Sequence, residues 1–418
     1  MRLHQSNVMP IFKITRRDVT RLLAWFFVLL PFEAAARLTR RPKQVPGTRT
    51  KILILRPDAL GDFIVWLDAA RGMRALYPPE KYEITLLANQ SWQALAEPMP
   101  WFDRVWGMDR KAFATNPIFR YRLLTRVRRE GFAEVINPIW TRDFLWSDPV
   151  ARVSGAPRRV CYSGDLSIIT PVLMRLVNAW YTRIIRSRAE PRQELERNAD
   201  FLRALGATDF RAGLPDLPRT PGLPEGFPDG DYYVLIPGAG KAYRQWPLEN
   251  YVQVARRMHE RTGWAGIVIG AGQDHALGEQ LAADREAGVQ NWAGRTSLSD
   301  LIRVIAGAQL VVGSETSGLH MAAALAKPSV CILGGGHYGR YVPYRTELPV
   351  THPLPVAAVH PMPCFGCNWA CIYKAPPDQP KPCIANISAE TVWQAIEPLL
   401  PSESAETRTL KGPGSVGG

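Results

Sequence analysis

The 418-residue chain has only six cysteines, and four of them stand close together between positions 364 and 383. Cysteines so few and so clustered do not form the framework of a small secreted disulfide protein. Long basic blocks interleaved with aromatic residues are also missing, although the net charge is +13. The charge favours an anionic partner, either a phosphorylated small molecule, an anionic membrane surface or nucleic acid, and the missing blocks weaken the last of these.

The N-terminus lacks a long apolar run. Segment Arg16–Arg41 has an apolar centre, Leu22–Phe32, with arginines on both sides. Eleven residues are too few to span a bilayer as a helix, which needs roughly 20. Three interpretations stay open: a helix lying in the interface of an anionic membrane with Trp25 among the acyl chains, a helix packed on the protein's own surface, or a signal peptide.

Short apolar runs alternate with segments of helical spacing from residue 51 onward. The runs predict strands at 51–56, 83–89, 104–108, 133–138, 232–240, 265–272, 309–313 and 329–334. The spacing predicts helices at 63–77, 194–207, 248–263, 274–287, 298–308, 317–326 and 388–400. This alternation predicts an α/β fold of parallel sheets with helices on both faces.

A Pro- and Gly-rich stretch, residues 212–231, interrupts the alternation and predicts a domain boundary. We expect an N-terminal extension over 1–48, a first domain over 49–215, a second over 216–400 that includes the cysteine cluster, and a disordered tail over 401–418. Parallel sheets of this kind bind ligands at the carboxyl ends of their strands, so the turns there are the candidate sites.

The sequence Ser-Glu-Thr-Ser-Gly-Leu-His opens the alanine-rich helix that follows the strand at 309–313. A helix N-terminus binds phosphate through its unpaired N–H groups. Thr316 or Ser317 can cap this helix, Gly318 lets a ligand approach the backbone, and His320 can donate to a phosphate. Glu315 would repel a phosphate, so we expect it to accept sugar hydroxyls. An ordinary capped helix with a hydrogen-bonded histidine is the alternative.

The turn after the strand at 232–240 carries two glycines and two cations. We expect Gly238, Gly240, Lys241 and Arg244 to clamp a diphosphate, the alternative being a loop with solvated cations. The turn is not a Walker loop, because no Gly-Lys-Ser/Thr has the required spacing from a first glycine. The segment 270–274, Gly-Ala-Gly-Gln-Asp, is too short for a dinucleotide fingerprint.

Charged residues also follow the first strand. Asp62 stands directly after a glycine at the start of a helix, where it is either an N-cap or a general base. Asp58, four residues earlier, is the rival base. We assign the binding of an anionic acceptor to Arg56 and Arg142.

The cysteine cluster consists of Cys364, Cys367, Cys371 and Cys383. Four thiolates at this spacing can close a structural zinc or iron–sulfur site, form a disulfide or remain free. A metal here would be structural, because no carboxylate or histidine stands nearby to complete an open catalytic site.

Four motifs, in this order, resemble glycosyltransferase family 9, the group of the lipopolysaccharide heptosyltransferases: ILRPDALGDFIVWLDAARGMRALYP, IPGAGKAYRQWPLENYVQVARRM, WAGRTSLSDLIRVIAGAQLVVGSETSGLHMAAALAKPSVCILGG and the closing CI..IS.E.V. The resemblance covers residues 51–399. It implies two Rossmann-like domains facing across a cleft, the GT-B arrangement, with the acceptor on the first domain and a nucleotide-sugar on the second.

The resemblance also implies residue roles. Asp62 matches the family's base, Arg244 replaces its phosphate-contacting lysine, and His320 matches the histidine of its donor helix. The family's Asp-Thr-Gly reads Glu315–Ser317 here, with the glycine one place later. These departures leave the sugar open, so ADP-heptose is one candidate among nucleotide-sugars. In the glycine-rich segment 334–344, we expect His337 and Arg340 to contact the diphosphate.

We therefore predict an inverting glycosyltransferase that needs no metal or other cofactor for catalysis. It would move a heptose or another sugar from a nucleotide-sugar to a lipopolysaccharide-core or other envelope glycan, in the cytoplasm and peripherally on the inner membrane face. The alternatives are a sugar-nucleotide epimerase or hydrolase of the same fold, a basic metal-stabilised nucleic-acid-binding protein, and a membrane-bound scaffold that binds a nucleotide-sugar without turnover.

Overall fold

The computed structural model describes residues 16–43, 46–187, 192–350, 352–374 and 376–401. The predicted tail lies, apart from its first residue, outside this part of the chain. Two compact units are present. Unit 1 contains residues 1–220, 297–302 and 339–351, and unit 2 contains the remainder of the chain.

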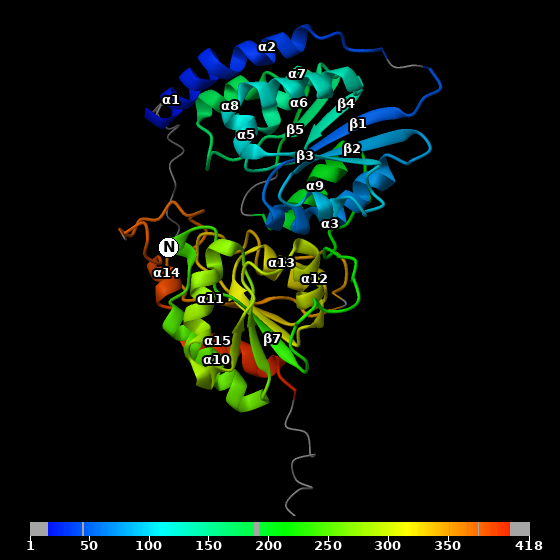
Figure 1. Cartoon of the computed structure of the whole chain (residues 1–418). Helices are drawn as coiled ribbons and strands as arrows, with labels where there is room; N and C mark the ends of the chain where they lie inside the picture. Colours follow the sequence, from blue (N-terminus) through cyan, green and yellow to red (C-terminus); the bar gives the residue numbers. More distant parts are fainter. Residues whose placement is uncertain (1–15, 44–45, 188–191, 351, 375, 402–418) are drawn as a thin grey trace, which may run out of the picture. The chain divides into compact units, whose positions relative to one another are not determined.

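Unit 1 is built on a parallel sheet of six strands in the order β3-β2-β1-β4-β5-β6 (Figure 1). The strands are β1 (Thr50–Arg56), β2 (Tyr82–Asn89), β3 (Arg104–Met108), β4 (Glu134–Asn137), β5 (Arg158–Tyr162) and β6 (Arg183–Ile185). In the central pairing, Ile52 of β1 lies opposite Ile84 of β2 and Glu134 of β4. Leucine and isoleucine fill β1 because helices cover both of its faces.

Helices connect and cover these strands. They are α1 (Arg16–Ala24), α2 (Leu30–Leu38), α3 (Leu60–Leu76), α4 (Gln93–Ala96), α5 (Arg110–Thr115), α6 (Pro117–Glu130), α7 (Ser147–Ser154), α8 (Pro171–Asn178) and α9 (Glu194–Leu205). A π-helical turn, Trp25–Leu29, joins α1 to α2. Asn116 caps α6 by accepting the N–H groups of Ile118 and Phe119, and Gly131 ends it in the left-handed conformation.

Unit 2 repeats the topology of unit 1. Its six parallel strands follow the order β12-β11-β10-β7-β8-β9, which is the same order when each unit is counted from its own first strand. The strands are β7 (Tyr232–Ile236), β8 (Ala265–Val268), β9 (Val289–Asn291), β10 (Leu310–Ser314), β11 (Ser329–Ile332) and β12 (Val356–Ala358). The order in which strands are added to the sheet reverses between β1 and β4 in unit 1 and between β7 and β10 in unit 2. Such sheets bind ligands at this switch point.

The helices after residue 220 are α10 (Leu248–Thr262), α11 (His275–Ala282), α12 (Leu298–Gly307), α13 (Ser317–Ala324), α14 (Pro382–Ala385) and α15 (Ala389–Ile396). Short 3-10 turns lie at Ala242–Arg244, Gly272–Asp274, Arg285–Ala287 and Glu397–Leu399. The core of unit 2 is formed by β7, β8, β10 and β11 against α10 and α15, with Tyr251 and Trp393 among its largest buried side chains.

The predicted α/β fold with parallel sheets is confirmed, and each predicted strand is present. Strands β5, β6, β9 and β12 were not predicted, because β5, β6 and β9 carry polar residues and β12 has only three residues. The helix predicted over 274–287 ends at Ala282. Asp284 begins a separate 3-10 turn there, and its side chain accepts the N–H of Ala287.

The N-terminal helix, which we define as Arg16–Leu38, packs one face on unit 1. Trp25 is buried against Phe144 and Trp180, and its indole N–H donates to Glu33 at 3.0 Å. Glu33 is completely buried and forms ion pairs with Arg120, at 2.5 Å, and with Arg152. The packed-helix interpretation is therefore confirmed for this face.

The same helix is longer than its apolar centre suggested. Val19–Leu38, 20 residues with a mean hydropathy of 1.6, is long and apolar enough to cross a membrane by length and composition. The expectation that this segment is too short to span a membrane is therefore wrong, because the helix itself is long enough. Length and composition do not by themselves assign a membrane span, because buried helices and signal sequences pass the same test.

We predict that Glu33→Gln destabilises the protein by roughly 3–5 kcal/mol, because the buried Arg120 and the partly buried Arg152 then lack their shared anion. Urea denaturation measures the loss. Glu390→Gln is the matched control: it breaks the exposed pair with Arg257, which contributes less than about 1 kcal/mol. Equal effects of the two substitutions would contradict the role of the buried pair.

Candidate functional site

The end of β1 places Asp62 in the first turn of α3. The N-cap of this helix is Ala59, and no side chain caps it. Instead the Asp62 carboxylate accepts the hydroxyl of Tyr341 at 2.6 Å, while Arg56 donates to the Asp62 carbonyl at 2.8 Å. The N-cap interpretation of Asp62 is therefore wrong, and its carboxylate is held by a side chain that the sequence analysis did not identify.

Tyr341 lies on the segment 339–351, which packs within unit 1 although the residues before it belong to unit 2. Its neighbour Arg340 forms ion pairs with Glu194, at 3.4 Å, and Asp165, at 3.6 Å. Arg340 therefore does not join the donor-side residues with which it was predicted to act. Burial raises the pKa of Tyr341 well above its usual range, and Asp62 adds to the shift, so this hydroxyl stays a proton donor.

Asp58 and Arg56 form an ion pair at 2.8 Å beside Asp62. The Arg56 guanidinium also lies over the Trp66 ring, 5.1 Å from its centroid. Burial raises the pKa of Asp58 to about 7, against the opposing effect of Arg56 and with a contribution from Asp62. The Asp58 carboxyl thus exchanges its proton near neutral pH.

Arg142 lies in the core of unit 1. Its guanidinium has no exposed surface and donates to Asp148 at 2.9 Å, the Tyr162 carbonyl at 3.1 Å and Asn178 at 2.7 Å. The assignment of Arg142 to acceptor binding is wrong for this geometry, because a buried and fully engaged guanidinium offers no donor to a ligand. Arg56, 4% exposed, keeps its Nε without a partner among the described residues.

In unit 2, Glu315 directly follows β10. Its carboxylate lies beside three residues that we expected at the nucleotide-sugar site. One carboxylate oxygen accepts Arg244 at 2.6 Å and His337 at 2.7 Å, and the other lies 3.6 Å from His320 Nε2. Burial alone would raise the pKa of Glu315, but His337, Arg244 and hydrogen bonds from both histidines hold it well below its usual range. Glu315 is therefore a buried, ionised carboxylate surrounded by donors.

The N-terminus of α13 begins beside this carboxylate. Thr316 occupies the N-cap position without a side-chain cap bond, and its buried hydroxyl oxygen has no partner among the described residues. Ser317 is the first helical residue and is partly exposed. At Gly318 a Cβ would lie 2.7 Å from Ile236 Cδ1, so this glycine serves helix–strand packing and not the approach of a ligand. The helix end keeps N–H groups for an anion.

The four predicted residues of the turn after β7 have different surroundings. A Cβ at Gly238 would collide with the Asp274 carboxylate, whereas Gly240 has open space around it. Lys241 is exposed, and Arg244 turns to Glu315. The sequence did not indicate that Asp274 supports this turn from below, where it is buried. The short sequence Gly-Ala-Gly-Gln-Asp was the only feature that could have suggested it.

Trp369 is a further residue that sequence reasoning missed. Its ring lies 5.2 Å from the Arg244 guanidinium, 5.5 Å from the His337 ring and 5.4 Å from the Tyr243 ring. Trp369 and Asn368 both have positive φ, 65° and 48°, a conformation that costs free energy and is found at functional sites. The available signal was the triple glycine 334–336, which lets this indole and Phe365 lie directly on the backbone.

Cys364, Cys367 and Cys371 lie on the loop that carries Trp369, and Cys383 lies in α14. The four thiols are free, and among the residues that the structure describes no group of three or more His, Cys, Asp or Glu side chains is arranged to hold a metal ion. Burial raises the pKa of Cys367 and of Cys383. The predicted structural zinc or iron–sulfur site therefore has no support in this geometry.

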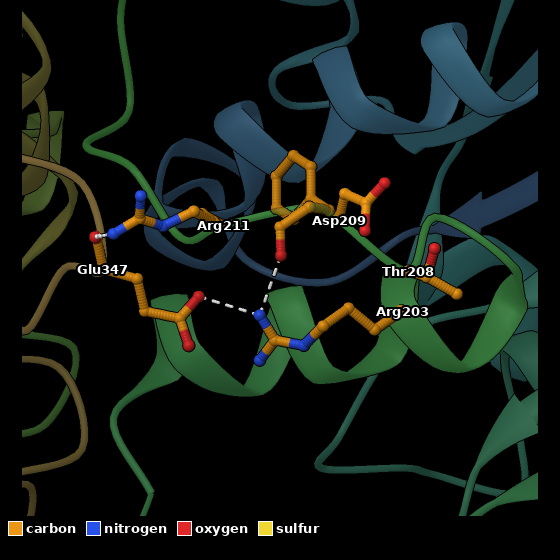
Figure 2. A pocket seen from close by; sticks show the side chains of 6 residues that line it. Arg203, Thr208, Asp209, Arg211 and Glu347 are labelled. Atoms are coloured by element: carbon orange, nitrogen blue, oxygen red, sulfur yellow. Dashed lines mark hydrogen bonds and ion pairs between the residues drawn. The ribbon is translucent and has the colours of Figure 1, made fainter.

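An open pocket of about 560 Å³ lies elsewhere in unit 1 (Figure 2). It is lined by Arg203, Thr208, Asp209, Phe210, Arg211 and Glu347. Arg203 already donates to Glu347 and to the Phe210 carbonyl, both at 2.8 Å, as the dashed lines in Figure 2 show. None of the predicted site residues lines it, so the strand-end clusters remain the candidate site.

Two parallel sheets of identical strand order, each with a charged cluster at its switch point, define a doubly wound α/β protein of the GT-B class. Residues 207–357 match the model of glycosyltransferase family 9 (heptosyltransferase). This part of the chain is therefore similar to that family, as its motifs suggested.

Curated relatives agree with the family model. Lipopolysaccharide heptosyltransferase 2 of Escherichia coli is 32% identical over 106 residues, which are 24% of this chain and 30% of that protein. The chain thus spans about a third of the length of this first relative. Lipopolysaccharide heptosyltransferase 1 of Pseudomonas aeruginosa is 26% identical over 314 residues, 69% of this chain and 82% of that protein.

Solved structures show the same fold. A family 9 glycosyltransferase of Veillonella parvula has a TM-score of 0.64 at 19% identity, covering 84% of this chain and 97% of that one. E. coli ADP-heptose lipopolysaccharide heptosyltransferase II has a TM-score of 0.61 at 19% identity, covering 84% of this chain and 98% of that one. These likenesses confirm the two-sheet fold class.

The raised pKa of Asp58 predicts a pH dependence of stability. The folded state keeps the Asp58 proton up to about pH 7, whereas the unfolded chain releases it near pH 4, so stability falls as the pH rises between these values. Asp58→Asn should remove this dependence and gain at most about 4 kcal/mol relative to wild type across the window. Urea denaturation at several pH values measures it.

The control for this prediction is Asp209→Asn, which neutralises an exposed carboxylate of the same unit. It should leave the slope of stability against pH unchanged. An Asp58→Asn variant with the wild-type slope would show that the Asp58 carboxyl is not the group that holds the proton.

Proposed function

We propose that this protein transfers a heptose or a related sugar from a nucleotide-sugar to a lipopolysaccharide-core or other envelope glycan. The observation that carries the proposal is the Glu315 cluster, which lies at the switch point of unit 2 and within the segment that the family model matches. The names of the similar proteins support ADP-heptose as the first donor to test.

The proposal gives unit 1 the acceptor and Asp62 the role of general base. Asp62 takes the proton of an acceptor hydroxyl, that oxygen forms a bond to the anomeric carbon of the donor, and the bond from this carbon to the diphosphate oxygen breaks with inversion. The Tyr341 hydroxyl, 2.6 Å from the carboxylate, supports this role, because it fixes the orientation of Asp62. We give Tyr341 the part of a positioning residue.

The proposal gives unit 2 the nucleoside diphosphate. The N–H groups at the start of α13, the unpartnered Thr316 hydroxyl and the exposed Lys241 are donors suited to the charge that develops on the leaving group. Glu315 then accepts sugar or ribose hydroxyls while Arg244 and His337 keep it ionised. No step calls for a metal ion, so we propose that transfer continues when divalent cations are chelated.

We propose that the reaction takes place on the cytoplasmic face of the inner membrane, where a lipid-linked acceptor would be presented. The net charge of +13 suits an anionic lipid surface. The epimerase and hydrolase alternatives differ from the proposal in a measurable way, because they consume the nucleotide-sugar when no acceptor is present.

We predict that Asp62→Asn lowers the turnover of ADP-heptose with a lipopolysaccharide-core acceptor by about 10²–10⁴-fold, because the amide cannot take the hydroxyl proton. The stabilisation of the protein by ADP-heptose in a thermal shift should stay at the wild-type value, since Asp62 belongs to unit 1 and the donor cluster to unit 2.

Asp58→Asn is the comparison for this experiment. If Asp58→Asn abolishes turnover and Asp62→Asn does not, the base is Asp58, with its pKa near 7.

Tyr341→Phe should lower kcat less than Asp62→Asn and shift the acid limb of the pH profile upward, because the carboxylate loses a hydrogen bond that favours its charged form. An unshifted profile would reduce Tyr341 to a packing residue.

We predict that Arg244→Ala weakens the binding of ADP-heptose by about 10-fold or more, because Glu315 then lacks its hydrogen-bonded cation. The concentration dependence of the thermal shift measures this affinity. The matched control is Arg257→Ala, which removes an exposed arginine of unit 2 from its pair with Glu390. Equal binding by the two variants would contradict the proposal that the Glu315 cluster binds the nucleotide-sugar.

A further inference from the structure

The N-terminal helix has a second apolar face that no described part of the chain covers. Its members are large apolar side chains with high exposure. They are Val19 (44% exposed), Leu23 (52%), Phe26 (56%), Phe27 (69%) and Leu38 (89%). The rings of Phe26 and Phe27 contact each other edge to face at 5.1 Å. Two adjacent phenylalanines this exposed mark an interaction surface.

The opposite face of the helix is fixed to unit 1, which sets the direction of the exposed face. Trp25, Leu29 and Ala36 are buried, and Glu33 is held by two arginines. Arg21 adds an ion pair with Asp143. The helix cannot roll its phenylalanines inward without breaking these contacts, so the exposed face is a stable feature of the fold.

The exposed face continues onto α8, which Figure 1 shows beside the N-terminal helix. Leu173 and Val177 of α8 share a buried cluster with Trp25 and Leu29. Three large apolar residues on α8 and the loop before it are exposed. They are Leu166 (53%), Ile168 (45%) and Leu176 (36%). The apolar surface is thus wider than one helix.

Positive charge surrounds this surface. Residues 16–41 contain six arginines and two acidic residues. Of these arginines, Arg37 and Arg40 are exposed at the end of the helix, where Lys43 is exposed as well, and Arg175 is exposed on α8. An apolar face bordered by exposed basic side chains is complementary to an anionic bilayer, where acyl chains lie under negative headgroups.

We propose that the outer face of the N-terminal helix, with the exposed residues of α8, docks the protein on an anionic lipid surface. Phe26, Phe27 and Leu23 enter the interface while the basic residues contact headgroup phosphates. The helix lies in the plane of the membrane and does not span it, because Glu33 and its two arginines bind the other face to unit 1. This inference is independent of the proposed sugar transfer and does not need it to be correct.

The test is co-sedimentation of the full chain with vesicles of phosphatidylcholine alone or mixed with phosphatidylglycerol. We expect binding to the mixed vesicles that weakens as salt is added. Phe26→Ser with Phe27→Ser should lower this binding at least about tenfold, because two large apolar side chains no longer enter the interface. The thermal shift with ADP-heptose should not change.

The matched control replaces two exposed apolar residues of unit 2, Leu223 (41%) and Ile372 (73%), by serine. It should bind the vesicles as wild type does. Phe27→Glu is a second test of the same surface, since a residue that is 69% exposed tolerates a charge without unfolding and the carboxylate repels anionic lipid. Circular dichroism checks that each variant is folded.

Four outcomes would overturn the proposal. Wild-type binding by the Phe26 and Phe27 variants, or no binding by the wild type, would remove the lipid surface as the partner. A dimer in solution that these variants convert to a monomer would assign the face to a second copy of the chain. Bound protein that resists an alkaline carbonate wash would indicate a spanning helix, whereas its release supports docking in the membrane plane.

Discussion

A buried carboxylate stays ionised only while donors surround it, and in unit 2 this requirement organises the strand ends around Glu315. Arg244 comes from the turn after β7, His320 from α13 and His337 from the loop after β11. These three segments are far apart in the sequence, and their side chains meet at the Glu315 carboxylate. Without an ionised carboxylate, Arg244 and the two imidazoles would lack the acceptor that they share at this point.

Unit 1 uses the same topology with a different electrostatic arrangement. Asp62 is oriented by a neutral hydroxyl, whereas its neighbour Asp58 lies beside Arg56 and still has a pKa near 7, because burial outweighs the ion pair. Two carboxyls near one strand end thus lie in different surroundings, one held by a hydroxyl and the other beside a guanidinium. Because burial favours the neutral form of Asp58, its charge opposes that of Asp62 less than a fully ionised carboxylate would.

Sequence reasoning predicted the features that depend on local pattern. The strands β1, β2, β7 and β10, the two parallel sheets and the position of Glu315 at a strand end all follow from apolar runs and the turns that interrupt them. It failed where tertiary contacts decide the role of a residue. Arg142 reads as a surface cation, but a carboxylate six residues later, Asp148, draws it into the core.

The glycine-rich segment shows the same limit. His337 and Tyr341 are four residues apart and were treated as one donor-side stretch, yet His337 contacts Glu315 in unit 2 and Tyr341 contacts Asp62 in unit 1. Nothing local marks the point between them where the chain passes from one unit to the other. Trp369 was equally hidden, because its place is set by the absence of side chains at residues 334–336 and not by its own neighbours.

The N-terminal helix shows why composition alone could not choose among its interpretations. An apolar segment flanked by arginines fits a surface helix, a membrane helix and a signal sequence equally well. The deciding residue is Glu33, whose charge is unfavourable in a bilayer and is stabilised here by Arg120 and Arg152, some ninety and one hundred and twenty positions away. Because that contact fixes one face to the protein, the remaining apolar face is left directed outward, and its exposure follows from the buried ion pair.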